Sequence, residues 1–272
     1  MPAPPRIISV VNEKGGVGKT TTAAHLARAI ALQGPTVVLV DMDGQATATK
    51  YMLGREDGRP PDIDRSVYDL LTNPDLDGLD VIRLSDRFQT GVIPSSIDLK
   101  TWFLDIVFEG EPVDLVEPIL SRRLDATSES LRDATGEPID FFLIDAPPSF
   151  GSLYLQALMA SDELLIPVTL ETLSIEGIYT FTETLEQLEA TIDYEPEILG
   201  ILPCMVDGRR TTQTPKKLSE LRDAFGPLLP PEETYVPINS ELAQAQHSLP
   251  GPSNAALRAY RNLGQWVLEN DR

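Results

Sequence analysis

Short runs of hydrophobic residues recur along the chain, separated by stretches with helical spacing. The runs are rich in β-branched and aliphatic residues and do not alternate with polar ones, which is typical of strands buried on both faces of a parallel sheet. Five runs are predicted as strands: 7–11, 37–40, 141–144, 164–168 and 198–202. The segment 20–33 carries Ala, Leu and Ile at helical spacing, and Gly34-Pro35 then ends the helix. Strand, loop, helix and strand form a βαβ unit, so we expect an α/β fold with a mostly parallel, twisted sheet flanked by helices.

Two segments interrupt this pattern. Residues 54–80 are rich in Pro, Gly and Asp, and we interpret them as surface loops around a short helix near 67–71. Residues 109–138 form an acidic stretch that is interpreted as a loop followed by a helix. The sequence has no internal repeat and no linker long enough to require a second domain. We therefore expect one domain that covers residues 1–272.

Composition narrows the class of protein. With 272 residues, 42% hydrophobic and 24% charged, the chain excludes disorder, collagen and coiled coil as its main architecture. Cys204 is the single cysteine, which excludes an intrachain disulfide framework and any multi-cysteine zinc or iron–sulfur site within one chain. No apolar run approaches the ~20 residues that span a bilayer, and the N-terminus does not resemble a secretory signal. The expectation is a soluble, cytoplasmic protein.

The formal net charge is -20, from 22 basic and 42 acidic residues. Such a molecule, taken as a whole, is repelled by nucleic acid and by anionic lipid. The balance constrains only the average surface and leaves room for a local basic patch.

A glycine-rich loop, EKGGVGKTT, lies between the first strand and the first helix. Glycines let backbone N–H groups turn inward, and the helix N-terminus adds partial positive charge, so this is where a phosphate would be held. Lys19 can reach the β- and γ-phosphates and the Thr20 hydroxyl can ligate Mg²⁺. The dinucleotide pattern fails because Thr21 replaces its third glycine, and the strict P-loop pattern fails at Glu13. What remains is a P-loop with a second lysine, Lys14, which cannot easily fold back on its own nucleotide.

Carboxylates follow two of the predicted strands. The second strand is followed by Asp41 and Asp43, and the run 141–144 ends in Asp145. A P-loop hydrolase needs acidic groups at the carboxyl ends of neighbouring strands, to hold the water shell of the metal and to orient the attacking water. Two carboxylates so close together repel each other unless a metal ion or a lysine compensates. The sequence therefore predicts a single-domain P-loop NTPase with Mg²⁺ near Thr20, Asp41 and Asp145.

These blocks together resemble the deviant Walker A ATPases, the ParA/MinD family, and most closely the ParA (Soj) branch, which partitions plasmids and chromosomes. NEKGGVGKTTTAAHLA resembles the family's Walker A segment, VVLVDMDGQATAT its Walker A′ segment and DFFLIDAPPSFGSLYLQALMASDELLIPVTLE its Walker B segment. VIPSSIDL and YVPINSELAQAQ resemble further family segments. One departure is Gly44, where the family usually has proline. The resemblance covers most of the chain.

The resemblance implies a role for each matching residue. Lys14 would cross a nucleotide-sandwich homodimer to the partner's phosphates, Asp43 would position the hydrolytic water, and Asp145 would act on Mg²⁺ through water. ATP and Mg²⁺ would be the cofactors. The residues expected to bind the nucleotide are Lys14, Gly15, Gly16, Val17, Gly18, Lys19, Thr20, Thr21, Asp41, Met205, Pro237 and Asn239, of which the last three match positions near adenine. The catalytic residues would be Lys14, Lys19 and Asp43. Because this lysine comes from the other protomer, ATP would hold the two copies together, whereas ADP would do so only poorly.

A basic patch is the candidate for DNA binding. Residues 208–222 hold five basic side chains and one acidic residue, Glu220, and form the densest positive stretch of the chain. ParA proteins bind DNA non-specifically near this region, so the resemblance implies phosphate contacts from Arg209, Arg210, Lys216, Lys217, Arg258 and Arg261. A nucleoid-associated location and a ParB-like stimulatory partner would follow. The alternative interpretation is a solvated surface of a loop and a helix.

The sequence supports the alternative functions to different extents. Relatives of this family position carboxysomes and other assemblies by the same cycle, so the cargo is not determined. A MinD-like membrane attachment is disfavoured because the C-terminal segment lacks a basic amphipathic face, and its apolar stripe is better explained as packing against the core. An iron–sulfur reductase of the nitrogenase type needs two cluster cysteines per protomer, and only Cys204 is present. A non-hydrolysing adaptor is disfavoured by the presence of Asp43.

Overall fold

A computed structural model describes most of the chain. The described residues are 3–54, 61–102, 117–170, 175–192, 196–207, 213–231, 234–239, 242 and 254–270, with the side chains of 175, 176 and 188–192 left out. The strands are β1 (Arg6–Val10), β2 (Val37–Asp41), β3 (Arg83–Ser85), β4 (Thr90–Ile93), β5 (Phe141–Asp145), β6 (Glu163–Thr169) and β7 (Glu197–Cys204). The α-helices are α1 (Lys19–Ala31), α2 (Thr47–Leu53), α3 (Val67–Thr72), α5 (Ile119–Thr135), α6 (Ser152–Met159), α7 (Ile175–Ile192), α8 (Gln213–Phe225) and α10 (Ala255–Glu269). Short 3₁₀ helices are η1 (Gly78–Asp80), η2 (Ile97–Lys100) and η3 (Gly226–Leu228).

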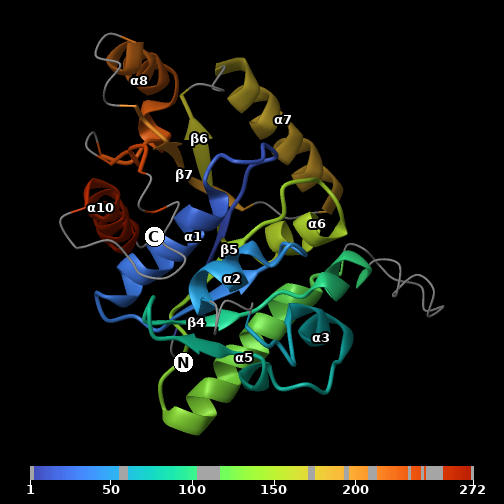
Figure 1. Ribbon diagram of the computed structural model, residues 1–272. Coiled ribbons are helices and arrows are strands. Elements are labelled where there is room, and N and C mark those ends of the chain that lie inside the picture. Colours follow the sequence, from blue (N-terminus) through green and yellow to red (C-terminus); the bar gives the residue numbers. More distant parts are fainter. Residues whose placement is uncertain are drawn as a thin grey trace.

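Within the described residues, seven strands form one sheet in the order β3-β4-β2-β5-β1-β6-β7 (Figure 1). Neighbouring strands are parallel except for β3 and β4. The five predicted strands correspond to β1, β2, β5, β6 and β7, so the predicted α/β fold with a mostly parallel sheet is confirmed. The sequence did not predict β3 and β4. They contain three and four residues and hold together through their antiparallel pairing and the parallel pairing of β4 with β2.

Alternate residues of the central strands face opposite layers. On β2, Val38 and Val40 join the core layer formed with α3, α5, α6, α7 and α8, whereas Val37 and Leu39 join the layer formed with α1, α2 and α10. In Figure 1, α1 and α10 lie on one side of the sheet and α6 and α7 on the other. The continuous hydrophobic runs follow from this arrangement, because both faces of each strand are buried.

The short helix predicted near 67–71 is α3, although it is a core element and not part of a surface loop. Val67 and Leu70 of α3 are fully buried in the core, although 55–60 lie outside the described residues. The predicted helix within 109–138 is α5, and its Leu120 and Leu124 are also fully buried. Both helices pack against one face of the sheet. The few apolar residues through which they pack are difficult to recognise in segments that are rich in polar residues and Pro.

The C-terminal helix α10 packs closely against α1. A Cβ atom at Gly264 would lie 2.9 Å from the Cβ of Ala29, so the two helix backbones approach each other at this glycine. Tyr260, Leu263 and Val267 of α10 are buried against α1 and the sheet. The expected packing of this apolar stripe against the core is confirmed.

A buried aromatic group surrounds His25 of α1. The His25 Nε2 atom lies 2.8 Å from the hydroxyl oxygen of Tyr51 on α2, and the imidazole stacks on the ring of Tyr260 with centroids 5.2 Å apart. Burial, together with the guanidinium groups of Arg28 and Arg87, lowers the pKa of His25 to about 3. Folding therefore keeps this imidazole neutral at pH values where the unfolded chain protonates it.

We predict that His25 makes the protein less stable in mild acid. Between pH 6.5 and 3 the unfolded chain binds a proton at His25 and the folded chain does not, so the free energy of unfolding falls as the pH falls below 6.5. At pH 5 the loss is about 2 kcal/mol. Urea unfolding of wild type and His25→Gln at pH 7.5 and pH 5 measures it. The variant should lose less stability than wild type between these pH values, and equal losses would contradict the prediction.

Candidate active site

The carboxyl ends of three adjacent strands meet at one edge of the sheet. Strand β5 lies between β1 and β2, and its last residue, Asp145, pairs in register with Val10 on one side and with Asp41 on the other. The glycine-rich loop follows β1 directly, and Asp43 follows β2. The topology thus brings together the loop and the aspartates that the sequence places far apart.

The glycine-rich loop has the conformation of an open cradle. Gly16 and Gly18 have φ angles of +76° and +97°, which residues with a Cβ atom rarely adopt. Cβ atoms built on Gly15 or Gly16 would meet nothing within 4 Å, so the loop borders space that a ligand can fill. Gly18 is the N-cap of α1 and no side chain caps that helix. The first N–H groups of a 13-residue helix therefore point toward this space, which fits a phosphate group.

Lys19 lies at the start of α1 with only 8% of its surface exposed. Its Nζ atom donates hydrogen bonds to the carbonyl oxygens of Asn12 at 2.8 Å and of Lys14 at 3.3 Å. Burial lowers its pKa, and the negative charges of Asp145 and Asp43 oppose that shift. The ammonium group is held inside the loop, close to both carboxylates, as the sequence predicts for a residue that binds phosphates.

Asn12 anchors the loop and was missed by the motif analysis. Its Nδ2 atom donates to the carbonyl oxygen of Pro167 on β6 at 2.8 Å, and its Oδ1 atom accepts a hydrogen bond from the backbone N–H of Lys14 at 2.9 Å. Its carbonyl also receives the Lys19 ammonium. One side chain thus ties the start of the cradle to a neighbouring strand. In the sequence, Asn12 opens the segment that resembles Walker A, but no role was predicted for it.

The other loop residues divide between the core and the surface. Val17 is buried and packs as a core residue, so it contributes its backbone to the cradle. Thr20 and Thr21 are half-buried on the first turn of α1, and Lys14 is exposed. The exposure of Lys14 agrees with a role outside its own protomer, which stays a prediction.

Asp41 and Asp145 form a buried pair of carboxylates. The Oδ2 atom of Asp41 accepts hydrogen bonds from the backbone N–H and the hydroxyl of Thr49, at 2.8 and 2.7 Å, and its Oδ1 atom accepts one from the N–H of Asp43 at 3.2 Å. Neither oxygen of Asp145 has a hydrogen-bond partner among the described residues, and the Thr20 hydroxyl is near but poorly placed for one. Burial raises the pKa of both groups: that of Asp41 rises to about 6, with a further contribution from the charge of Asp43, and that of Asp145 rises further because of the charge of Asp41. The two unpartnered oxygens of Asp145 fit a hydrated cation, whereas Asp41 chiefly holds the turn after β2.

Asp43 occupies the turn that Asp41 organises. Its side chain is half-buried, and its Oδ1 atom accepts a hydrogen bond from the N–H of Gln45 at 2.9 Å. At the next residue, a Cβ on Gly44 would lie 2.6 Å from Cγ of Lys100. The departure from proline at this position is thus accompanied by a lysine side chain packed over the glycine.

Comparisons with known proteins agree with this geometry. A family model described as an AAA domain matches residues 5–198. Soj of Bacillus subtilis, a sporulation initiation inhibitor protein, is 33% identical over 97% of this chain and 99% of its own length. The chromosome-partitioning ATPase Soj of Thermus thermophilus is 35% identical over 97% and 95%, and the chromosome partitioning protein ParA of Caulobacter vibrioides is 30% identical over 99% and 96%. This chain belongs to the ParA/MinD family of partition ATPases.

Solved structures place the same fold around a nucleotide. A cobyrinic acid a,c-diamide synthase from Mycobacterium smegmatis with a bound ATP analogue and magnesium has a TM-score of 0.75 and 29% identity, over 97% of this chain and 94% of that one. An aspartate-to-alanine variant of Cyanothece McdA in complex with ATP has a TM-score of 0.76 at 20% identity, over 98% and 96%, and shows the fold alone. The P-loop fold with ATP and Mg²⁺ as cofactors therefore agrees with the sequence analysis.

The three residues expected near adenine lie together in this ParA-family chain. Met205 follows β7 with a φ of +53° and is 43% exposed, and Val206 forms a bridge with Pro237. Cys204 borders the P-loop, because a Cβ on Gly18 would lie 3.8 Å from its Cβ. Asn239 is occupied by the chain itself: its side-chain nitrogen donates to Asn254 and its side-chain oxygen accepts from the N–H of Leu242, both at 3.0 Å. The adenine contacts stay predictions.

The residues expected to bind DNA are only partly described. Arg209 and Arg210 lie outside the described residues. Lys216 of α8 is 78% exposed at its side chain and lies 3.7 Å from Glu220, whereas the Lys217 ammonium donates to the carbonyl oxygen of Leu170 at 2.6 Å. Arg258 and Arg261 are exposed on α10. Lys216 is therefore better placed than Lys217 to reach an external phosphate.

We predict that Asn12→Ala weakens ATP binding about tenfold, because the cradle loses two hydrogen bonds that hold its first turn. Isothermal titration with an ATP analogue and Mg²⁺ measures the effect. Asn73→Ala is the matched control, since Asn73 makes a similar local turn, with its Oδ1 3.1 Å from the N–H of Asp75, on a loop away from the P-loop. Unchanged affinity in Asn12→Ala would show that the loop does not depend on this anchor.

Proposed function

We propose that this chain is an ATP hydrolase that forms a homodimer with ATP sandwiched between its protomers, binds DNA non-specifically, and segregates a plasmid or chromosome with a ParB-like stimulatory partner. The observation that carries the proposal is the convergence of Lys19, Asp43 and Asp145 at the edge of the sheet where the open glycine loop ends. The near full-length similarity to Soj and ParA proteins supports the same reading.

Different groups of described residues would bind the nucleotide and the metal ion. The backbone of 15–18 and the Lys19 ammonium would hold the β- and γ-phosphates, and Thr21 the α-phosphate. Thr20 and the two unpartnered oxygens of Asp145, acting through water, would hold Mg²⁺. When bound, Mg²⁺ neutralises charge on the phosphate oxygens. Its charge also offsets the repulsion between Asp41 and Asp145, which would return both carboxylates to the ionised form.

Hydrolysis needs a water molecule aligned with the terminal phosphorus. Asp43 lies on the turn that Asp41 fixes through Thr49, and its half-buried carboxylate is the group that can accept a hydrogen bond from that water. The water oxygen bonds to the γ-phosphorus, the bond from that phosphorus to the β–γ bridging oxygen breaks, and ADP leaves with the electron pair. The water protons pass to solvent and phosphate.

The exposed position of Lys14 supports its role in a dimer. Its backbone is held by Asn12 while its side chain lies at the surface of the loop. A lysine that reaches the γ-phosphate of the opposite protomer adds charge-assisted contacts only while that phosphate is present. Hydrolysis would then separate the protomers.

We predict opposite effects of two substitutions on the dimer. Lys14→Ala should stay monomeric with ATP and Mg²⁺, because the contact across the dimer is lost, and Asp43→Ala should stay dimeric with phosphate release greatly reduced. Light scattering after size exclusion and a phosphate-release assay measure both, with Lys216→Ala as the exposed-lysine control. If both variants hydrolyse ATP like wild type, the assignment of this site is wrong.

DNA binding is proposed for the basic stretch 208–222 together with the exposed arginines of α10. Five basic side chains meet one acidic residue there, in a chain of net charge -20. Contacts to phosphates release counterions, so the binding constant should fall as the salt concentration rises. A plot of the logarithm of the binding constant against the logarithm of the salt concentration should steepen by roughly one unit for each contact. Nucleoid association would follow from this binding.

We predict that Arg209→Glu combined with Arg210→Glu abolishes ATP-dependent binding to duplex DNA, because both substitutions place repulsive charge in the patch. Fluorescence anisotropy at several salt concentrations measures the loss. The double variant Arg65→Glu and Arg122→Glu is the control: it changes net charge equally at exposed positions, and Arg122 is on α5, at the opposite end of Figure 1 from α8. Equal binding by wild type and the Arg209/Arg210 variant would remove the patch from the proposal.

The alternatives receive less support. A non-DNA cargo is compatible with the same cycle, but the relatives at 30% identity or more that carry a function in their names are mostly chromosome-partitioning proteins. For MinD-like attachment, the apolar stripe of α10 is already buried in the core. Among the described helices, none combines the length and apolar character needed to cross a bilayer.

A further inference from the structure

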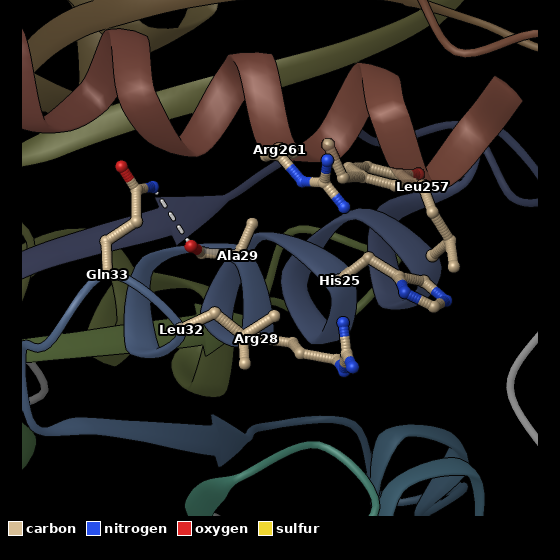
Figure 2. Close-up of a pocket in the computed structure, with 8 residues that line it drawn as sticks. His25, Arg28, Ala29, Leu32, Gln33, Leu257 and Arg261 are labelled. Atoms are coloured by element: carbon tan, nitrogen blue, oxygen red, sulfur yellow. Dashed lines mark hydrogen bonds between the residues drawn. The ribbon is translucent and has the colours of Figure 1, made fainter. Parts of the chain in front are cut away.

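A cavity of about 360 Å³ lies between α1 and α10, away from the P-loop. Arg28 is nine residues beyond Lys19 on α1, which places it roughly 13 Å farther along the helix axis. Figure 2 shows Arg261 reaching from α10 into the space between the two helices, while His25 and Arg28 extend from α1. Small-molecule sites have volumes of about 300–1,000 Å³, so this cavity is large enough for an organic ligand.

The cavity concentrates positive charge without a compensating acid. None of the described residues that line it is acidic, and neither Arg28 nor Arg261 forms an ion pair with a described residue. Burial and the like charge of Arg261 lower the pKa of Arg28, and its buried Nε atom has no hydrogen-bond partner in the described chain. Two guanidinium groups that line the same cavity in an acidic protein are the donors that an anion requires.

Arg28 is not needed to end its own helix. The carbonyl oxygens of the last turn of α1 already accept hydrogen bonds: that of Ala29 from the Gln33 side chain at 3.0 Å (dashed in Figure 2), and those of Arg28, Ile30 and Ala31 from following backbone N–H groups. The guanidinium group therefore has no role in capping these carbonyls.

His25 and the apolar wall define the kind of anion. His25 Nδ1 is buried and unpartnered in the described chain, and the imidazole is neutral, so one nitrogen is left for a ligand. A phosphate monoester in its monohydrogen form offers acceptors for both arginines and one O–H donor, whereas a DNA phosphodiester has no such O–H. Leu32, Leu257 and Tyr260 line the rest of the space, which a bare phosphate ion would not fill.

We propose that the α1–α10 cavity binds a small organic phosphate monoester, with the phosphate between Arg28 and Arg261, the imidazole of His25 beside it, and the organic part against Leu257 and Tyr260. The site is distinct from the P-loop. It shares Arg261 with the proposed DNA-binding surface, so it is tested in the ADP-bound state, in which the proposed function has no DNA bound. Tyr260 also lies 3.2 Å from the Thr22 hydroxyl, one turn into α1, so an occupant would contact a residue joined to the start of that helix.

Phenyl phosphate is the probe, titrated by calorimetry into the full chain saturated with ADP and Mg²⁺ so that the P-loop is filled. Wild type should bind one molecule, and Arg28→Gln and Arg261→Gln should each bind it at least about tenfold more weakly. Arg258→Gln, one turn away on α10 and outside the cavity lining, is the matched control and should bind like wild type. Arg261 is an exposed residue, so its variant keeps the test valid if Arg28→Gln fails to fold.

Further titrations distinguish a small organic phosphate from other phosphate-containing ligands. These titrations are run at about pH 5.5, below the second pKa of about 6 of a phosphate monoester, so that phenyl phosphate carries its O–H group. Inorganic phosphate should bind more weakly than phenyl phosphate because it lacks the organic part. Phenyl sulfate, which has the same organic part and a single negative charge but no O–H group, should also bind more weakly. Excess duplex DNA should not displace phenyl phosphate. Absence of binding at ADP saturation, equal binding by the arginine variants and wild type, equal binding of phenyl sulfate and phenyl phosphate, or displacement by DNA would each overturn the proposal. ATP hydrolysis and dimerisation enter none of these measurements.

Discussion

The buried pairing of Asp41 with Asp145 is the constraint around which the site is built. The two carboxylates occupy opposing positions on neighbouring parallel strands, out of contact with water, where like charges repel strongly. The chain compensates only one of them, through three hydrogen bonds to Asp41. The charge of Asp145 is compensated only by the Lys19 ammonium group and, when one is bound, by a cation. The protein alone thus leaves the repulsion between these carboxylates only partly compensated, at the place where a bound Mg²⁺ would supply positive charge.

The loop and the turn after β2 are positioned by different neighbours. Asn12 fastens the start of the glycine loop to β6, and Thr49 fastens the turn carrying Asp43 to Asp41. Both anchors are neutral side chains that hydrogen-bond the backbone or a carboxylate, so they position charged residues without changing the local charge. A small displacement of either anchor would move Lys14 or Asp43 relative to the phosphates, which is why the geometry depends on residues that take no part in the chemistry.

The sequence predicted the elements whose signal is local. Continuous apolar runs gave five strands, and the glycine loop with Asp41, Asp43 and Asp145 gave the candidate site, because parallel strands bring their carboxyl ends to one edge. It missed β3 and β4, which pair with each other and, through β4, with β2. It predicted the helix α3, but not that the few apolar residues of this helix are buried by tertiary contacts. Asn12 and the Arg28–Arg261 cavity also escaped prediction, since each joins residues from distant parts of the chain.

The single sulfhydryl of the chain is enclosed where the nucleotide loop meets the last strand. Cys204 is 2% exposed, its Sγ atom lies 3.7 Å from the Thr22 hydroxyl, and burial raises its pKa to about 12. A thiol in this state is a poor nucleophile toward alkylating or oxidising reagents. It becomes reactive only when α1 separates from the end of β7. Its rate of modification would therefore report how often α1 separates from the end of β7, without any label being introduced into the protein.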